Sequence, residues 1–351
     1  MKKLCFIATV PDVVHSFLKG HLRASAAKWP VTIVSNPAGA ELLNDLDARF
    51  IPLAIKRKAS PWRDLLVLIQ LTILFRRERF DLVHSIMPKT GLLAMLAGWL
   101  AGVPNRIHTF TGQVWSNKRG WKRGVLKLFD RLIVLFATHI LVDSPSQRDF
   151  LISEGVLPQG KGAVIGHGSI CGVDAQRFRF NAKERDAVRA ELSIAPEQNV
   201  ILFLGRLNRD KGILDLAAAF ADIASHREDV VLMLVGAEED VPFARVQEIC
   251  GVHREQLRRV GFISDPERYM SAADIFCLPS YREGFGQVII EAAAMGVPAV
   301  CSRIYGITDA VEDGKTGLLF PAGDAAALTQ ALLKLLEDRD LRQQMGEAAR
   351  V

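Results

Sequence analysis

Short apolar runs alternate with longer amphipathic stretches along most of the chain. In the first half, the apolar runs predict strands over residues 4–10, 31–35, 50–55, 81–87, 106–110, 139–144 and 163–168. In the second half, they predict strands over residues 199–205, 229–236, 258–264, 274–280 and 298–303. Short strands separated by helical patterns are typical of mostly parallel, doubly wound sheets, which bind ligands at the carboxyl ends of their strands.

A polar segment over residues 172–185 interrupts this alternation and predicts a linker. It divides the 351 residues into two doubly wound, Rossmann-like domains over residues 1–171 and 186–351. The apolar run after the two N-terminal lysines is short, and we interpret it as the first strand and not as a signal peptide. No stretch approaches the roughly 18–20 apolar residues that span a bilayer.

The segment with the clearest chemistry is SYREGFGQVIIEAAAMG, over residues 280–296. It predicts the end of a strand, a glycine turn with Glu283 before it, and a helix from Gln287 that carries Glu291. The N-terminus of a helix offers unpaired N–H groups and a positive dipole end, which suit a phosphate. A surface loop followed by a helix with a solvated glutamate would explain the same pattern.

A second strand end carries two cations. The segment VILFLGRLNRDKG, over residues 200–212, places Arg206 and Lys211 after an apolar strand. They could be ordinary surface charges. Beside the glycine turn of a neighbouring strand, they would complete a diphosphate site, with arginine as a bidentate donor and lysine as a point charge.

Together these two segments resemble the retaining glycosyltransferases of family 4, which combine G-R-x(3–5)-K-G with E-G-F-G and a second glutamate after seven residues. The resemblance implies an α/β fold of the GT-B class, with two doubly wound Rossmann-like domains facing across a cleft. First-half segments resemble enzymes that extend undecaprenyl-diphosphate-linked saccharides in capsule, O-antigen or N-glycan precursor synthesis. These segments are FLKGH (17–21), HSIMPKTG (84–91), HTFTGQVW (108–115) and GSICGVD (168–174).

The resemblance also assigns roles to single residues. Arg206 and Lys211 would bind the diphosphate, Glu291 the ribose hydroxyls and Glu283 the donor sugar, with His108 assisting at that sugar. The catalytic residues would be Glu283, His108, Arg206 and Lys211. The nucleotide-sugar site would comprise Arg206, Lys211, Phe262, Gly284, Phe285, Gly286 and Glu291. The acceptor side would comprise His84, Lys89, Thr109, Gln113 and Ser144, although a lone histidine at the end of a strand is more often structural.

The predicted activity is transfer of a sugar from a nucleotide diphosphate to a lipid-linked saccharide, with retention at the anomeric carbon. The resemblance favours UDP and an N-acetylhexosamine or related sugar, and GDP-mannose remains open. We expect no cofactor and no metal, because the D-x-D pairs at Asp45 and Asp338 lie in amphipathic helical patterns. A nucleotide-sugar epimerase of the same fold and a non-catalytic nucleotide-sugar-binding protein are the alternatives.

Charge is divided unevenly between the two halves. Residues 1–175 have 23 Lys and Arg against 12 Asp and Glu, a balance of +11, whereas residues 176–351 have 21 against 27, a balance of −6. Basic, tryptophan-bearing amphipathic patterns over residues 56–79 and 117–135 predict reversible binding to an anionic membrane. A core helix with a solvated basic face is the alternative, and a nucleic-acid partner is not expected.

Localisation and chain length complete these expectations. The five scattered cysteines, without a C-x-x-C pair, predict reduced, buried thiols in a cytoplasmic protein. The basic amphipathic patterns and the resemblance to enzymes of lipid-linked saccharides predict that it is peripheral on the inner face of the cell membrane. Family members usually continue for about one more helix beyond a position equivalent to residue 351, so we expect the chain to be truncated.

Overall fold

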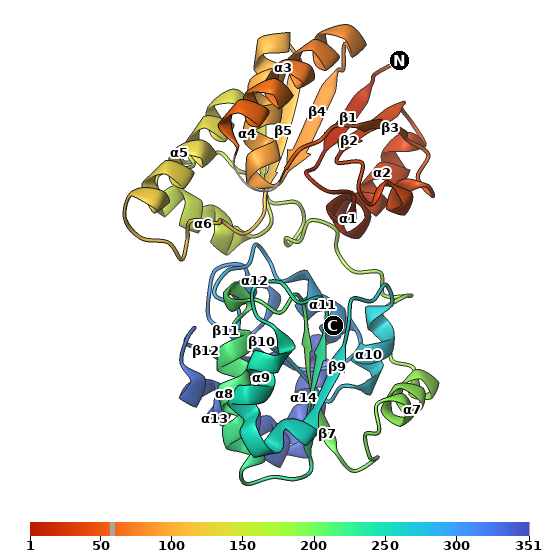
Figure 1. Ribbon diagram of the computed structural model, residues 1–351, viewed down its shortest axis with the longest axis vertical. Helices are drawn as coiled ribbons and strands as arrows, with labels where there is room; N and C mark the ends of the chain where they lie inside the picture. Colours follow the sequence, from red (N-terminus) through yellow and green to blue (C-terminus); the bar gives the residue numbers. More distant parts are fainter. Residues whose placement is uncertain (57–59, 351) are drawn as a thin grey trace. The chain divides into compact units, whose positions relative to one another are not determined.

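The computed structural model describes residues 1–56 and 60–350, which form two compact units (Figure 1). The units are Met1–Cys171 and Gly172–Val351, and each is described here by itself. The predicted linker 172–185 belongs to the second unit, and its last four residues, 182–185, already form the start of a helix. Arg57 and Lys58, part of the predicted basic segment 56–79, lie outside the described residues.

The first unit is built on a six-stranded parallel sheet with the strand order β3-β2-β1-β4-β5-β6. This is the Rossmann order, in which the chain reverses direction across the sheet between β1 and β4. The strands are β1 (Leu4–Ile7), β2 (Val31–Ser35), β3 (Arg49–Pro52), β4 (Leu82–Ile86), β5 (Asn105–Phe110) and β6 (His139–Val142).

Helices cover both faces of this sheet, and successive residues of β1 show why. Cys5 and Ile7 belong to one hydrophobic core, while Leu4 and Phe6 belong to a second core on the opposite face. The helices are α1 (Pro11–Val13), a π-helical turn (Val14–Leu18), α2 (Lys19–Ala26), a 3₁₀ turn (Ala40–Leu43), α3 (Pro61–Glu78), α4 (Pro88–Ala101), α5 (Gly120–Phe136) and α6 (Pro145–Ser153).

The second unit repeats this plan, with the strand order β12-β11-β10-β7-β8-β9. Its six strands are parallel, and β8 is buried at all six positions, as expected for a sheet covered on both faces. The strands are β7 (Asn199–Leu204), β8 (Val230–Val235), β9 (Leu257–Val260), β10 (Ile275–Leu278), β11 (Ala299–Ser302) and β12 (Gly317–Phe320).

One continuous hydrophobic core joins the sheet of the second unit to its helices. The helices are α7 (Ala182–Glu191), a 3₁₀ turn (Arg209–Lys211), α8 (Ile213–Ala224), α9 (Phe243–Cys250), a 3₁₀ turn (Gly251–Gln256), α10 (Pro266–Ala272), α11 (Gln287–Ala294), α12 (Ile307–Ala310), α13 (Ala325–Glu337) and α14 (Arg339–Ala349).

Two strand predictions need correction. The strand predicted over residues 163–168 is wrong, because Gly162, Gly166 and Gly168 all have positive φ angles and only Ala163 bridges to β6. The short strand β12 was missed. One thiol prediction also fails, since Cys171 is exposed while the other four cysteines are buried.

Candidate active site

The candidate site of the second unit lies where β7 and β10 run side by side. These two strands are neighbours in the sheet although they are far apart in the sequence, and the chain reverses direction between them. In open α/β sheets this is the position where ligands bind, at the carboxyl ends of the strands. Arg206 follows β7 there, and the segment that contains Glu283 follows β10.

Two glycines allow the backbone to take the shape that this site requires. Gly212 has φ +70°, and a Cβ atom added to it would lie 2.0 Å from the carbonyl oxygen of Pro279. The loops after β7 and β10 therefore touch through their backbones. Gly286 has φ +87° and immediately precedes α11, so the predicted glycine turn and the helix from Gln287 are confirmed.

An ion pair joins the two loops. Lys211 Nζ lies 2.5 Å from Glu283 Oε1, and Ser280 Oγ donates to the same oxygen over 2.8 Å. Both charged side chains are largely buried, with 22% of Lys211 and 12% of Glu283 exposed. Two residues that the sequence assigned to one site, 72 positions apart, are therefore in direct contact.

Arg206 has a partner that sequence reasoning missed. Its guanidinium is ion-paired with Glu239, which also accepts a hydrogen bond from Asn208 Nδ2 over 2.5 Å. Asn208 in turn accepts from the backbone N–H of Lys211 over 2.9 Å, so it orients the turn that carries the lysine. Glu239 follows β8, and the rule that placed Arg206 at a strand end would have found it.

Glu291 lies inside α11, and its carboxyl group is largely removed from water. Gln287 Nε2 lies 3.4 Å from Glu291 Oε1, one turn earlier on the same helix. Burial raises the pKa of Glu291 to about 7, and this effect outweighs the opposing influence of Gln287 and Arg177. Of the two predicted aromatic residues, Phe285 is buried and Phe262 is 70% exposed.

The first unit brings its two predicted histidines together on neighbouring strands, β4 and β5. His84 Nε2 is hydrogen-bonded to Thr109 Oγ1 at 2.8 Å, and His108 Nδ1 is hydrogen-bonded to Ser85 Oγ at 2.9 Å. His108 is only 1% exposed, and α4 packs so closely over its ring that a Cβ at Gly91 would lie 2.3 Å from it. The structure thus gives His108 an interior environment, and its predicted role at the donor sugar stays a prediction.

The other predicted acceptor residues also have partners within the first unit. Ser144 is fully buried and caps α6 by accepting from the backbone N–H of Gln147 over 3.1 Å. The Gln147 side-chain amide donates to Gln113 Oε1 over 3.3 Å, which joins these two predicted residues into one group. Lys89 Nζ lies 2.6 Å from Asp64 Oδ1 of α3, away from that group.

Backbone strain marks one further position that the sequence did not suggest. Met87, between β4 and α4, has φ +74°, which is unusual for a residue other than glycine. It lies at the reversal point of this sheet, where Thr9 Oγ1 after β1 is 2.6 Å from Thr90 Oγ1 of α4. The carboxyl edge of β1 and β4 is therefore the candidate acceptor region.

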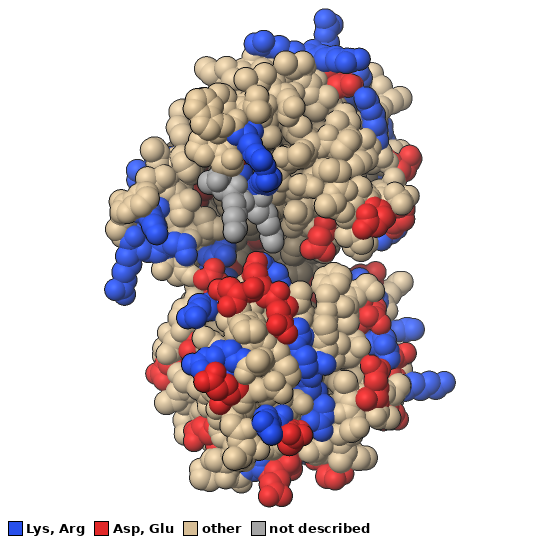
Figure 2. All heavy atoms as spheres, in the orientation of Figure 1, with Lys and Arg blue, Asp and Glu red and all other residues tan. Residues whose placement is uncertain are grey.

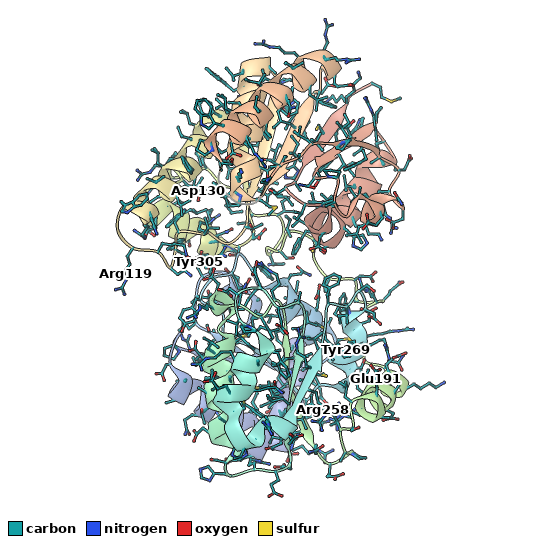
Figure 3. All side chains as sticks on the ribbon, viewed as in Figure 1. Arg119, Asp130, Glu191, Arg258, Tyr269 and Tyr305 are labelled. Atoms are coloured by element: carbon teal, nitrogen blue, oxygen red, sulfur yellow. The ribbon has the colours of Figure 1, made fainter. Side chains whose placement is uncertain are left out.

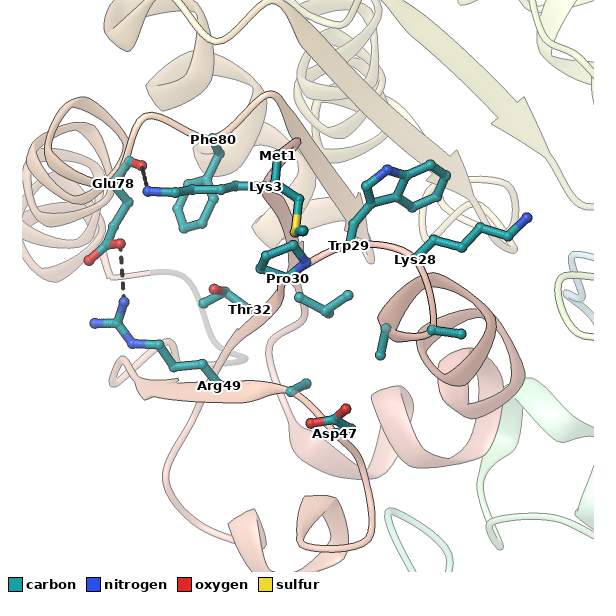
Figure 4. A pocket seen from close by; sticks show the side chains of 14 residues that line it. Met1, Lys3, Lys28, Trp29, Pro30, Thr32, Asp47, Arg49, Glu78 and Phe80 are labelled. Carbon is teal, nitrogen blue, oxygen red and sulfur yellow. Dashed lines mark hydrogen bonds and ion pairs between the residues drawn. The ribbon is translucent and has the colours of Figure 1, made fainter.

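The most evident pocket of the first unit lies at the opposite edge of the sheet (Figure 4). It has a volume of about 540 Å³ and is lined by residues that precede β1 and β2, among them Lys3, Lys28 and Trp29. Arg49 and Glu78 form an ion pair of 3.1 Å within it. Because ligands of doubly wound sheets bind at the carboxyl edge, we exclude this pocket from the candidate site.

Comparison with known proteins identifies the family of this chain. Residues 11–168 match the model described as "Glycosyl transferase 4-like domain", and residues 184–351 match "Glycosyl transferases group 1". The chain is 30% identical over 304 residues to the capsular polysaccharide biosynthesis glycosyltransferase CapM of Staphylococcus aureus, covering 86% of this chain and 79% of that protein. The chain is a family 4 glycosyltransferase.

Two further comparisons extend this result. The chain is 28% identical to the UDP-Gal:alpha-D-GlcNAc-diphosphoundecaprenol alpha-1,3-galactosyltransferase of Escherichia coli, covering 88% of this chain and 79% of that enzyme. Among solved structures, sucrose-phosphate synthase from Thermosynechococcus elongatus has a TM-score of 0.78 and 25% identity, covering 100% of this chain and 93% of that one. The predicted GT-B fold class of this glycosyltransferase is confirmed.

The D-x-D pairs of this glycosyltransferase have structural partners. Asp45 forms an ion pair of 2.6 Å with Lys19, and Asp338 caps α14 by accepting from the backbone N–H of Leu341. Across residues 1–56 and 60–350, no group of three or more His, Cys, Asp or Glu side chains is placed to hold a metal ion. Metal independence of the reaction stays a prediction.

The raised pKa of Glu291 makes a prediction about stability. The charged form of Glu291 is disfavoured in the folded protein. The loss of folding free energy from ionising it therefore grows as pH rises from about 4.5 to about 7, and it is constant at higher pH. Glu291→Gln removes this cost, which is at most about 3 kcal/mol. We expect the variant to raise the thermal midpoint by several degrees relative to the wild type at pH 8, and by much less at pH 5.

The matched control for this measurement is Glu255→Gln, because Glu255 is an exposed carboxylate of the same unit. Its midpoint should differ little from that of the wild type at both pH values. Equal shifts for Glu291→Gln at pH 5 and pH 8 would contradict the raised pKa.

The two histidines on β4 and β5 make a second prediction. Burial lowers the pKa of His84 to about 4 and that of His108 to about 3, so both imidazoles should be neutral throughout the physiological range. In NMR spectra of the histidine-labelled chain, we expect their resonances to stay at neutral positions between pH 5 and pH 8. Assignment would come from His84→Asn and His108→Asn, and a titration midpoint near pH 6 for either ring would contradict its burial.

Proposed function

We propose that this glycosyltransferase transfers an N-acetylhexosamine or related sugar from UDP to a lipid-linked saccharide, with retention at the anomeric carbon. The observation that carries the proposal is the contact of Lys211 with Glu283 at the reversal point of the second sheet. That contact supports the proposal because it brings together the cation that we assign to the diphosphate and the carboxylate that we assign to the sugar hydroxyls. The name of the related Escherichia coli enzyme supports a UDP-linked donor and a diphosphoundecaprenol-linked acceptor.

In this proposal the donor site acts mainly by stabilising charge. The bond between the anomeric carbon and the diphosphate oxygen breaks, and its electron pair leaves with the diphosphate. Lys211, Arg206 and the N-terminus of α11 lie at one end of the sheet and would stabilise that negative charge. Arg206 would leave Glu239 and bind phosphate oxygens, because a guanidinium pairs with carboxylates and with phosphates.

Glu283 and Glu291 would bind the two ends of the donor. Glu283 would accept hydrogen bonds from the sugar hydroxyls while it still contacts Lys211, whose ammonium group has three donors. Glu291 would bind the ribose hydroxyls from within α11. The acceptor hydroxyl would attack from the face that the diphosphate leaves, and its proton would pass to the departing phosphate oxygen. No cofactor is needed for this sequence of bond changes.

A lipid-linked acceptor places the reaction at a membrane, and we propose that the protein works as a peripheral protein on the inner face of the cell membrane. None of the helices in the described part of the chain is long and apolar enough to cross a bilayer. The capsule function in the name of the Staphylococcus aureus relative supports a role in surface polysaccharide synthesis.

Substitution at the donor site tests the catalytic assignment. Removing one charge-stabilising group typically costs about 10²–10³-fold in rate, so Lys211→Ala should lose most transfer while remaining folded. Glu291→Gln should also lose most transfer, because a neutral amide binds the ribose hydroxyls less strongly. The assay combines a UDP-sugar with an undecaprenyl-diphosphate saccharide, and NMR of the product reads the anomeric configuration.

Lys315→Ala and Glu255→Gln are the controls, since both remove exposed charges of the second unit away from β7 and β10. Full activity of Lys211→Ala would remove that residue from the site, and an inverted product would overturn retention. Activity should persist in EDTA, and loss in EDTA with recovery in magnesium would overturn the metal-free part of the proposal.

Thermal denaturation with candidate donors tests the donor class. A ligand present at about 100 times its dissociation constant adds roughly 2.7 kcal/mol of stability. At roughly 2–4 °C per kcal/mol, this should raise the midpoint by several degrees. We expect stabilisation by UDP and one UDP-sugar in the presence of EDTA, and a smaller shift in Lys211→Ala. Stabilisation by GDP-mannose would correct the donor, and stabilisation by NADH alone would overturn the site.

A further inference from the structure

Helix α3 of the first unit is apolar on two faces although it lies at the surface. Val67, Leu71 and Phe75 are buried and face the core of the unit. A second apolar stripe faces solvent at the helical spacing of three and four residues. Its members are Trp62, Leu65, Leu66, Ile69 and Ile73, which are 47–81% exposed.

The neighbouring helices continue this apolar surface. Helix α4 packs against both α3 and α5, so it lies between them. It exposes Trp99 and Leu100 near its C-terminal end. Helix α5 exposes a stripe of its own, formed by Trp121, Val125, Leu128, Phe129 and Leu135.

This concentration of apolar side chains is unusual for the chain as a whole. In the described residues, more than half of the exposed large hydrophobic side chains lie on these three helices, and the others are scattered. Scattered apolar side chains need no explanation, but a contiguous exposed patch marks an interaction site. We call the outer surface of these helices, formed by the exposed residues named above, the α3–α5 face.

The exposed charges beside the α3–α5 face are positive. The three helices contain only three acidic residues: Asp64 pairs with Lys89, Glu78 pairs with Arg49, and Asp130 is buried where it accepts from Trp115 over 2.7 Å. The exposed cations on these helices and just before α5 are Arg63, Arg76, Arg77, Lys118, Arg119, Lys122 and Arg131. Figure 2 shows mostly tan atoms over α3 and α4, and Figure 3 shows Arg119 extending into solvent.

We propose that the α3–α5 face docks on an anionic lipid bilayer. An exposed apolar surface on three adjacent helices, with cations and three exposed tryptophans, suits the boundary between headgroups and acyl chains, where such residues gain most from partial burial. Anionic headgroups would neutralise cations that have few acidic neighbours on this face. The inference deepens the proposed function by naming the surface that reaches the membrane of a lipid-linked acceptor.

Sedimentation with vesicles tests the docking face on the full chain. We expect the protein to bind vesicles of phosphatidylcholine with phosphatidylglycerol at low salt, and to bind much less at high salt. Binding to vesicles of phosphatidylcholine alone should be weaker. A protein that stays in the supernatant with anionic vesicles at low salt would overturn the proposal.

Two variants separate the apolar contribution from the charged one. The triple change Leu66→Ser, Ile69→Ser and Ile73→Ser should abolish measurable binding, because it removes the centre of the exposed α3 stripe. The double change Arg76→Gln and Arg77→Gln should weaken binding to anionic vesicles about fivefold per cation and reduce its salt dependence. Binding equal to that of the wild type in either variant would overturn the assignment of the face.

Matched controls come from the second unit. Val252→Ser removes a side chain that is 87% exposed, and Arg254→Gln removes an exposed cation. Both should bind vesicles like the wild type. Light scattering tests whether a second copy of the chain covers the face instead. A wild type that is a dimer, does not bind vesicles and becomes a monomer in the triple variant would support that alternative and overturn membrane docking.

Failure of the docking face can be distinguished from failure of the proposed function. Stabilisation by UDP reports on the second unit and should be retained by both α3 variants. Loss of vesicle binding with retained stabilisation by UDP would support the docking face alone. Retained stabilisation by UDP in a wild type that ignores anionic vesicles would overturn the docking face and leave the proposed donor site intact.

Discussion

The pairing of β7 with β10 is the constraint on which the candidate site of the second unit depends. It joins strands that are separated by three helices and two other strands in the sequence, and it does so at the one place in the sheet where the chain changes direction. The loops after the two strands then meet closely enough that Gly212 tolerates no side chain. Lys211 and Glu283 reach each other because of this backbone contact, and the ion pair in turn fixes both loops.

The polar groups of the first unit differ in kind from the ion pairs of the second unit. In the first unit, His84 and His108 have lowered pKa values and are hydrogen-bonded to hydroxyl groups, and burial raises the pKa of Asp130 to about 7. Trp115 donates to Asp130 and stacks on Phe150 at a centroid distance of 5.4 Å, so the loop after β5 is held against α5 and α6. These contacts join the polar groups of the first unit to its own elements, whereas the candidate site of the second unit is built from the ion pairs of Arg206 with Glu239 and of Lys211 with Glu283.

Much of the fold and the position of the candidate site could be predicted from the sequence, because parallel strands are short, apolar and separated by helices. The glycine turn and both site segments were found because each follows a strand whose pattern is clear. The strand predicted over residues 163–168 failed because an apolar run says nothing about backbone angles, and Gly166 and Gly168 within it and Gly162 just before it take positive φ. β12 was missed because GLLF is four residues long, and only its neighbour β11 makes it a strand.

Side-chain direction was the part that the sequence could not supply. A histidine at the end of a strand can point to the ligand edge or into the core, and the closeness of α4 at Gly91 encloses the His108 ring. Likewise, the alternation of apolar residues in α3 does not reveal that one of its two apolar stripes lacks a covering element. That distinction depends on which helices α3 packs against, and only α4 does so extensively.

The unequal charge of the two halves agrees with the separate tasks that we propose for them. The second half carries a balance of −6, yet its candidate site contains the cations Arg206 and Lys211, which are paired with Glu239 and Glu283. The effect of surface charges falls off within about 8 Å at physiological ionic strength, so the local arrangement governs a diphosphate site more than the net charge does. A bilayer is a broad anion and interacts with many cations at once. Net charge therefore matters more for a bilayer than for a diphosphate site, and the excess of +11 belongs to the half that carries the α3–α5 face, for which we propose membrane docking.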